Sequence, residues 1–84
     1  MSDFLYGIMK EQLHRQVLKA VAAQGGTGNV TEALQWQKER FDEAFLLAND
    51  IQNLDYVKLL YSNFNKNLIV VELTLVGLAK SRDV

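Results

Sequence analysis

A glycine-rich segment divides this chain into two unequal parts. Three of its five glycines, Gly25, Gly26 and Gly28, fall within four residues, and the chain has no proline to mark another break. Glycine loses more backbone entropy on folding than any other residue, so a helix through this segment is disfavoured. We therefore predict a turn over residues 25–29, with separate elements before and after it.

The residues before this turn predict a helix over about residues 3–23. Ser2 and Asp3 both have side chains that can cap its first turn. Its apolar residues recur at a strict four-residue spacing, which is typical of a helix. They are Leu5, Met9, Leu13, Val17 and Val21.

The residues after the turn predict a second helix over about residues 31–50. Asn29, followed by Glu32 three residues later, fits a capping box, and Thr31 is a competing N-cap. The apolar residues that follow recur at steps of three and four. They are Val30, Ala33, Leu34, Phe41, Phe45, Ala48 and Ile51.

The last third of the chain predicts a helix over about residues 55–80. A cluster of asparagine and aspartate between residues 49 and 55 favours a break before it, although one bent helix over residues 31–80 also fits. Residues 68–76 are rich in β-branched side chains and alternate like a strand, so a strand stays an alternative there. We favour a helix, because the rest of the chain offers no evident partner strand.

These elements predict an all-α fold, a helical hairpin or three-helix bundle, in a single domain over residues 1–84. Of these residues 49% are hydrophobic, whereas a chain this short buries only roughly 60 to 65% of the surface that its unfolded form exposes. The chain has no cysteine for a disulfide. We therefore expect association, with its own copies or another protein, to cover the remaining apolar side chains.

The charge and the length of the apolar segments disfavour other partners. The formal net charge is −1, with nine basic and ten acidic residues, which disfavours nucleic acid and makes a DNA-binding regulator a weaker alternative. The longest apolar run is about twelve residues and includes Glu72, whereas a membrane span needs roughly 20. The N-terminus lacks the pattern of a secretory signal, so we expect a cytoplasmic location.

No motif predicts catalysis, a cofactor or a metal. The glycines at 25–28 are followed by Asn29 and Val30, not by the lysine of a phosphate-binding loop. His14 is the only histidine, and the sequence shows no group placed to orient it as a base or to complete a zinc site. We therefore expect a protein that is not an enzyme and holds no cofactor or metal ion.

The function expected from these patterns is protein–protein interaction or self-assembly. The apolar stripe of the last predicted helix, together with Trp36 as a large flat anchor, is the candidate interface. Its members are Trp36, Val57, Leu60, Tyr61, Phe64, Leu68, Val71, Leu75 and Leu78.

In size and layout the chain also resembles the small helical-hairpin needle subunits of type III secretion systems and their helical co-chaperones. The resemblance rests on a helix, a turn at Gly25 to Asn29, and a longer helix that carries the residues at 35–39. The proline usual in the turn of needle subunits is absent. The resemblance implies, as an alternative function, a subunit or co-chaperone of a secretion filament.

Overall fold

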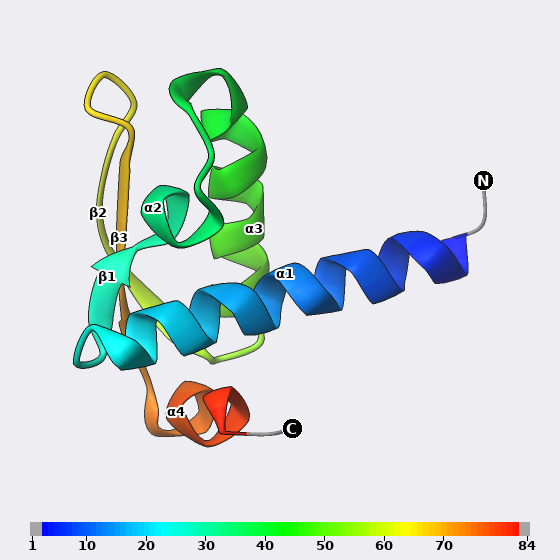
Figure 1. The fold of residues 1–84 in the computed structure, drawn as a ribbon. Coiled ribbons are helices and arrows are strands. Elements are labelled where there is room, and N and C mark those ends of the chain that lie inside the picture. Colours follow the sequence, from blue (N-terminus) through cyan, green and yellow to red (C-terminus); the bar gives the residue numbers. More distant parts are fainter. Residues whose placement is uncertain (1–2, 83–84) are drawn as a thin grey trace.

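The chain folds into helices that cover one face of a small antiparallel sheet (Figure 1). A computed structural model describes residues 3–82, with side chains from residue 9 onward. Its elements, in chain order, are α1 (Asp3–Ala23), β1 (Thr27–Asn29), α2 (Val30–Leu34), the 3-10 helix η1 (Lys38–Arg40), α3 (Phe41–Asn53), β2 (Val57–Asn63), β3 (Leu68–Leu73) and α4 (Leu75–Ser81).

The predicted all-α fold, whether hairpin or bundle, is therefore wrong. The segment predicted as a helix over residues 55–80 forms the hairpin β2–β3, and only its end is helical, as α4. The strand order is β1-β3-β2, with both pairs antiparallel. The partner strands that the prediction lacked come from this same chain, and one of them, β1, lies within the segment predicted as a glycine turn.

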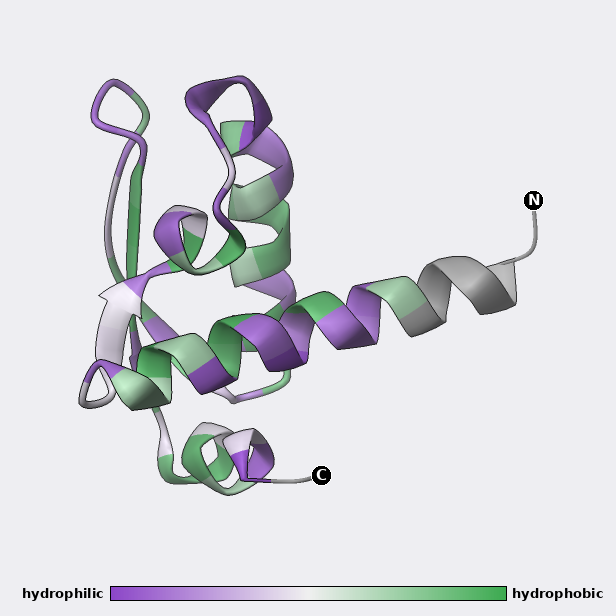
Figure 2. Cartoon of the chain, viewed as in Figure 1, coloured by the Kyte–Doolittle hydropathy of each residue, from purple (hydrophilic) through white to green (hydrophobic). Residues whose placement is uncertain are grey.

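The alternation in β3 reflects the two faces of the sheet. Ile69 and Val71 are fully buried, whereas Glu72 is exposed. Successive side chains of a strand point to opposite faces, so one face of β3 joins the core and the other faces outward. Apolar colouring runs along β3 in Figure 2. The strand alternative for this segment is thus the correct one for residues 68–73.

The hairpin turn, residues 64–67, is built by asparagines. Asn67 has a φ of 53°, a left-handed conformation that asparagine tolerates better than most residues. The Asn63 side-chain oxygen accepts a hydrogen bond of 3.1 Å from the Lys66 N–H. These local bonds favour a tight turn over continuation of a helix.

The predicted helix over residues 31–50 is also wrong, because it is broken in its middle. α2 ends at Leu34, and Gln35 has a left-handed φ of 59°. The Asn67 side chain donates a hydrogen bond of 3.1 Å to the Trp36 carbonyl, so the hairpin turn occupies an acceptor that a continuous helix would use. A single bent helix over residues 31–80 is excluded for the same reason.

Asn29 joins the start of α2 to the hairpin. Its side-chain oxygen accepts hydrogen bonds from the Thr31 N–H at 3.3 Å and from the Ile69 N–H at 2.9 Å. Its side-chain nitrogen donates to the Asn67 carbonyl at 3.4 Å, and the Thr31 hydroxyl donates to the same carbonyl at 2.6 Å. We call these three residues, Asn29, Thr31 and Asn67, the asparagine hub.

The Asn29→Ala variant should lose about 2 kcal/mol or more of unfolding free energy. The change removes the N-cap of α2. It also leaves the backbone N–H of Ile69 without its hydrogen-bond acceptor. Urea unfolding of the variant and the wild type measures the difference. Asn65→Ala, in the exposed part of the hairpin turn, is the control and should change stability by less than about 0.5 kcal/mol. Equal stabilities of the two variants would contradict the role of the hub.

The core lies between the helices and the inner face of the sheet. It brings together residues of α1, α2, α3 and both long strands, and their exposed fractions are 7% or less. Its members are Val17, Leu18, Val21, Val30, Leu34, Phe41, Ala44, Leu47, Ala48, Ile51, Val57, Ile69 and Val71.

The short helix α4 packs closely against the turn that leads from α3 into β2. Thr74 caps α4 by accepting a hydrogen bond of 3.0 Å from the Gly77 N–H, and its own N–H donates to the Tyr56 carbonyl at 3.0 Å. A Cβ atom on Gly77 would lie 1.8 Å from the Tyr56 carbonyl oxygen. Only glycine therefore permits this contact without movement of the backbone.

We expect Gly77→Ala to destabilise the protein by about 1 to 3 kcal/mol, because the new methyl group forces α4 away from Tyr56. Thermal unfolding checks this. The exposed neighbour Ala79→Ser is the matched control. A Gly77→Ala variant that melts with the wild type would show that α4 is not held by this contact.

Candidate functional site

The order of the elements directs attention to α3. α2 and α3 are consecutive helices joined by residues 35–40, which include η1, and the β2–β3 hairpin follows them. In helix-turn-helix DNA-binding proteins, the second of two consecutive helices enters the major groove. The outward side of α3 is therefore the first surface to test for nucleic-acid chemistry.

The outward side of α3 is acidic and apolar. Asp42 and Glu43 are exposed in its first turn, and Leu46 exposes 65% of its surface. Further along α3, the Asp50 carboxylate forms an ion pair of 2.8 Å with the Lys10 ammonium. Acidic side chains here repel phosphates, so this helix does not have the charge of a DNA-reading helix.

The two basic side chains beside the start of α3 contact aromatic rings. The Lys38 ammonium lies 5.0 Å from the centre of the Phe64 ring, and the Arg40 guanidinium lies 3.6 Å from that of Trp36. Arg40 also bonds Glu43 at 3.0 Å, and this hydrogen bond lowers the pKa of the exposed Glu43 carboxyl. Lys38 therefore links the interhelical turn to the hairpin, and Arg40 links the same turn to α3.

The outward face of the β2–β3 hairpin carries apolar side chains at its centre. Tyr61 lies opposite Val70 in the register, and Lys58 lies opposite Glu72. Residues that face each other across antiparallel strands share a side of the sheet, so these four lie on the side away from the buried Val71. Leu68 follows the same alternation. We call the following residues the outer hairpin face: Lys58, Tyr61, Leu68, Val70 and Glu72.

The nine residues of the predicted interface do not form one surface. Val57 and Val71 are core residues, with exposed fractions of 2% and 0%. Tyr61 and Leu68 lie on the outer hairpin face, with Leu60 at a register shift beside Tyr61. The other four lie on other elements or at the hairpin turn.

Of those four, Phe64 is half-exposed at the hairpin turn and packs edge-on against Phe41, with ring centres 5.3 Å apart. Trp36 lies half-buried in the turn before α3. Leu75 and Leu78 lie on α4, where Leu75 exposes 85% of its surface. In a continuous helix the spacing of these residues would place them on one side, but in the observed fold they lie on different elements.

Val70 is a half-buried apolar residue of the outer hairpin face that was not among the predicted interface residues. The signal was present in the alternation of residues 68–73, which places Leu68, Val70 and Glu72 on one side. It was outweighed by the helical period of the same segment.

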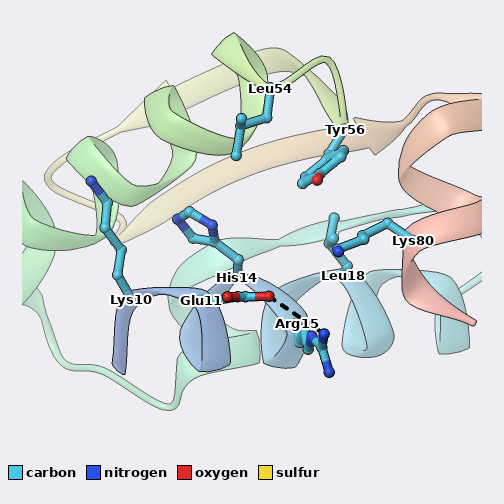
Figure 3. A pocket seen from close by; sticks show the side chains of 8 residues that line it. All are labelled: Lys10, Glu11, His14, Arg15, Leu18, Leu54, Tyr56 and Lys80. Atoms are coloured by element: carbon cyan, nitrogen blue, oxygen red, sulfur yellow. Dashed lines mark hydrogen bonds and ion pairs between the residues drawn. The ribbon is translucent and has the colours of Figure 1, made fainter. Parts of the chain in front are cut away.

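A pocket of about 230 Å³ lies between α1, the turn from α3 into β2, and α4 (Figure 3). His14 and Leu18 rise from α1 toward Leu54 and Tyr56, and Lys80 reaches in from α4. Lys10, Glu11 and Arg15 complete the lining. The pocket thus has an apolar wall and a rim of charged groups.

Among the residues that the structure describes, two buried polar atoms of this pocket find no hydrogen-bond partner. They are the Nε2 of His14 and the Nε of Arg15. Only 9% of His14 is exposed, and burial lowers the pKa of its imidazole. The nearby Asp50 and Glu11 carboxylates raise that pKa, whereas the Lys10 ammonium lowers it further.

The lowered pKa of His14 predicts loss of stability in mild acid. A histidine that the folded state keeps neutral binds its proton more tightly in the unfolded chain, so unfolding becomes easier as pH falls through the ordinary value near 6.5. The loss of stability is absent at pH values well above the ordinary pKa of histidine. It grows as the pH falls and levels off below the folded-state pKa of His14. We expect the unfolding free energy to decrease between about pH 7.5 and 5.5.

Ring proton NMR shifts of this single histidine, followed against pH, test the prediction directly. A folded-state pKa at or above the ordinary value would contradict it. His14→Gln removes the titrating group and should flatten the dependence of stability on pH over that range.

Neither family models, nor curated proteins, nor solved structures yielded a match to this chain. Among residues 3–82, no three histidine, cysteine, aspartate or glutamate side chains come together as a metal site. Within the same residues, no helix is both long and apolar enough to cross a bilayer.

Proposed function

We propose that this protein is a non-catalytic interaction module that pairs with a second copy of itself through the outer hairpin face. The observation that carries the proposal is the apolar centre of that face, Tyr61, Leu68 and Val70, on the side of the sheet that the helices leave uncovered. A cytoplasmic location is part of the proposal, since the chain has no cysteine and suits a reducing compartment.

An uncovered sheet face ordinarily carries polar side chains. Antiparallel sheets with one solvated face alternate apolar residues inward and polar residues outward, and this hairpin departs from that rule at its centre. Tyr61 exposes 48% of its surface, as does the adjacent Leu60. Covering such side chains contributes on the order of a few kcal/mol, and tyrosine is enriched among the residues that dominate binding energy.

The charges on this face favour a second copy as the partner. Lys58 and Glu72 lie opposite each other at one end of it. A two-fold axis presents the same surface from both sides, so each lysine can meet a glutamate of the other copy. The net charge of −1 adds little repulsion between copies.

The two alternative functions have less support. The two consecutive helices α2 and α3 are compatible with a DNA-binding regulator, but the acidic outward side of α3 disfavours it. The resemblance to secretion-needle subunits rested on a helical hairpin, and the sheet replaces that layout. We therefore do not propose either.

Sedimentation velocity over a range of concentrations tests the proposal. The wild type should form a dimer, and the double variant Tyr61→Ser with Val70→Thr should weaken the dimer at least about tenfold. Leu75→Ser, which removes an even more exposed leucine on α4, is the matched control and should leave the dimer intact. A monomer at every concentration, or a dimer lost only with Leu75→Ser, would overturn the proposal.

A further inference from the structure

We propose that the pocket between α1, the α3–β2 turn and α4 binds a small carboxylate with an apolar body. The pocket shares no residue with the outer hairpin face, so this inference is independent of the proposed function. It combines a cavity, an apolar wall, three basic side chains in the lining and, among the described residues, two buried polar atoms without hydrogen-bond partners.

The apolar wall selects the body of the ligand. Leu18 belongs to the core, whereas Leu54 is half-exposed and Tyr56 is half-buried at the pocket. Figure 3 shows these three side chains converging from α1 and from the turn after α3. The volume of about 230 Å³ lies below the roughly 300 to 1,000 Å³ of pockets for larger ligands, so a single ring or a short branched chain fits.

The lining charges select the head group. Three basic side chains, Lys10, Arg15 and Lys80, line the pocket against one acidic side chain, Glu11. Lys10 pairs with Asp50, and Arg15 contacts Glu11 at 3.4 Å. An incoming carboxylate joins these pairs as an additional acceptor of charge-assisted hydrogen bonds.

The unpartnered atoms show where hydrogen bonds are missing. Of the three buried side-chain nitrogen and oxygen atoms without partners in the described residues, two belong to His14 and Arg15. Arg15 Nε is always a donor, and neutral His14 can donate from Nε2, so both atoms suit an acceptor ligand. Leaving such groups unpaired costs about 1 to 3 kcal/mol each, which a carboxylate oxygen would recover in part.

Access of the ligand to these atoms requires a change of the Arg15 rotamer. Both atoms lie beneath the surface of the lining. The Arg15 and Glu11 side chains that cover this side are 36% and 58% exposed, so they can turn outward without disturbing the core. The ligand carboxylate then becomes an additional acceptor for Arg15 beside Glu11.

NMR titration of the full chain with benzoate tests the proposal. We expect shifts of the amides of His14, Leu18, Tyr56 and Lys80, with a Kd on the order of 1 mM. Benzyl alcohol and benzylamine, which keep the ring but lack the carboxylate, should bind at least about fivefold more weakly. Equal binding of the three probes, or no shifts around the pocket, would overturn the proposal.

Matched lysine variants separate this site from nonspecific binding of anions. Lys80→Gln should weaken benzoate binding about threefold to fivefold, because one basic group leaves the pocket rim. Lys19→Gln, on the same helix as His14 but outside the lining, should bind benzoate like the wild type. Equal weakening by both variants would show general attraction to the protein charge and would also overturn the proposal.

Discussion

The arrangement of this protein depends on the asparagine hub, in which Asn29, Thr31 and Asn67 share hydrogen bonds. Asn29 caps α2 and also accepts from the N–H of Ile69 in β3. Asn67 occupies the left-handed position of the hairpin turn and donates to the carbonyl of Trp36. One set of side chains thereby fixes the start of α2, the break before α3 and the position of the hairpin.

Contacts away from the hub block the β2 edge of the sheet. β2 is an edge strand, and its Leu59 N–H donates to the Gln52 side chain of α3 at 2.7 Å. A register shift between Leu59 and Tyr61 further interrupts the edge. Capped and bulged edges resist the addition of another strand, which is why the proposed self-association uses the outer hairpin face and not this edge.

The candidate sites were foreseen only in part. Tyr61, Leu60 and Leu68 were identified as interface candidates, but the helical stripe that suggested them also included Val57 and Val71, which the core buries. Helical and strand periods coincide at several of these positions, so spacing alone did not separate inward from outward residues. The pocket was not foreseen, because it joins His14, Tyr56 and Lys80 from three separate elements.

Local sequence determined the first helix, the left-handed glycines at 25 and 26, and the capping role of Asn29, because each depends on neighbouring residues. Tertiary structure alone decided that residues 57–73 form a hairpin and that the helix predicted over 31–50 divides. Both outcomes depend on hydrogen bonds between distant segments, such as β1 with β3 and Asn67 with Trp36. Side-chain periodicity reports which residues are apolar at a given pitch, but it contains no information on which backbone groups a distant strand will satisfy.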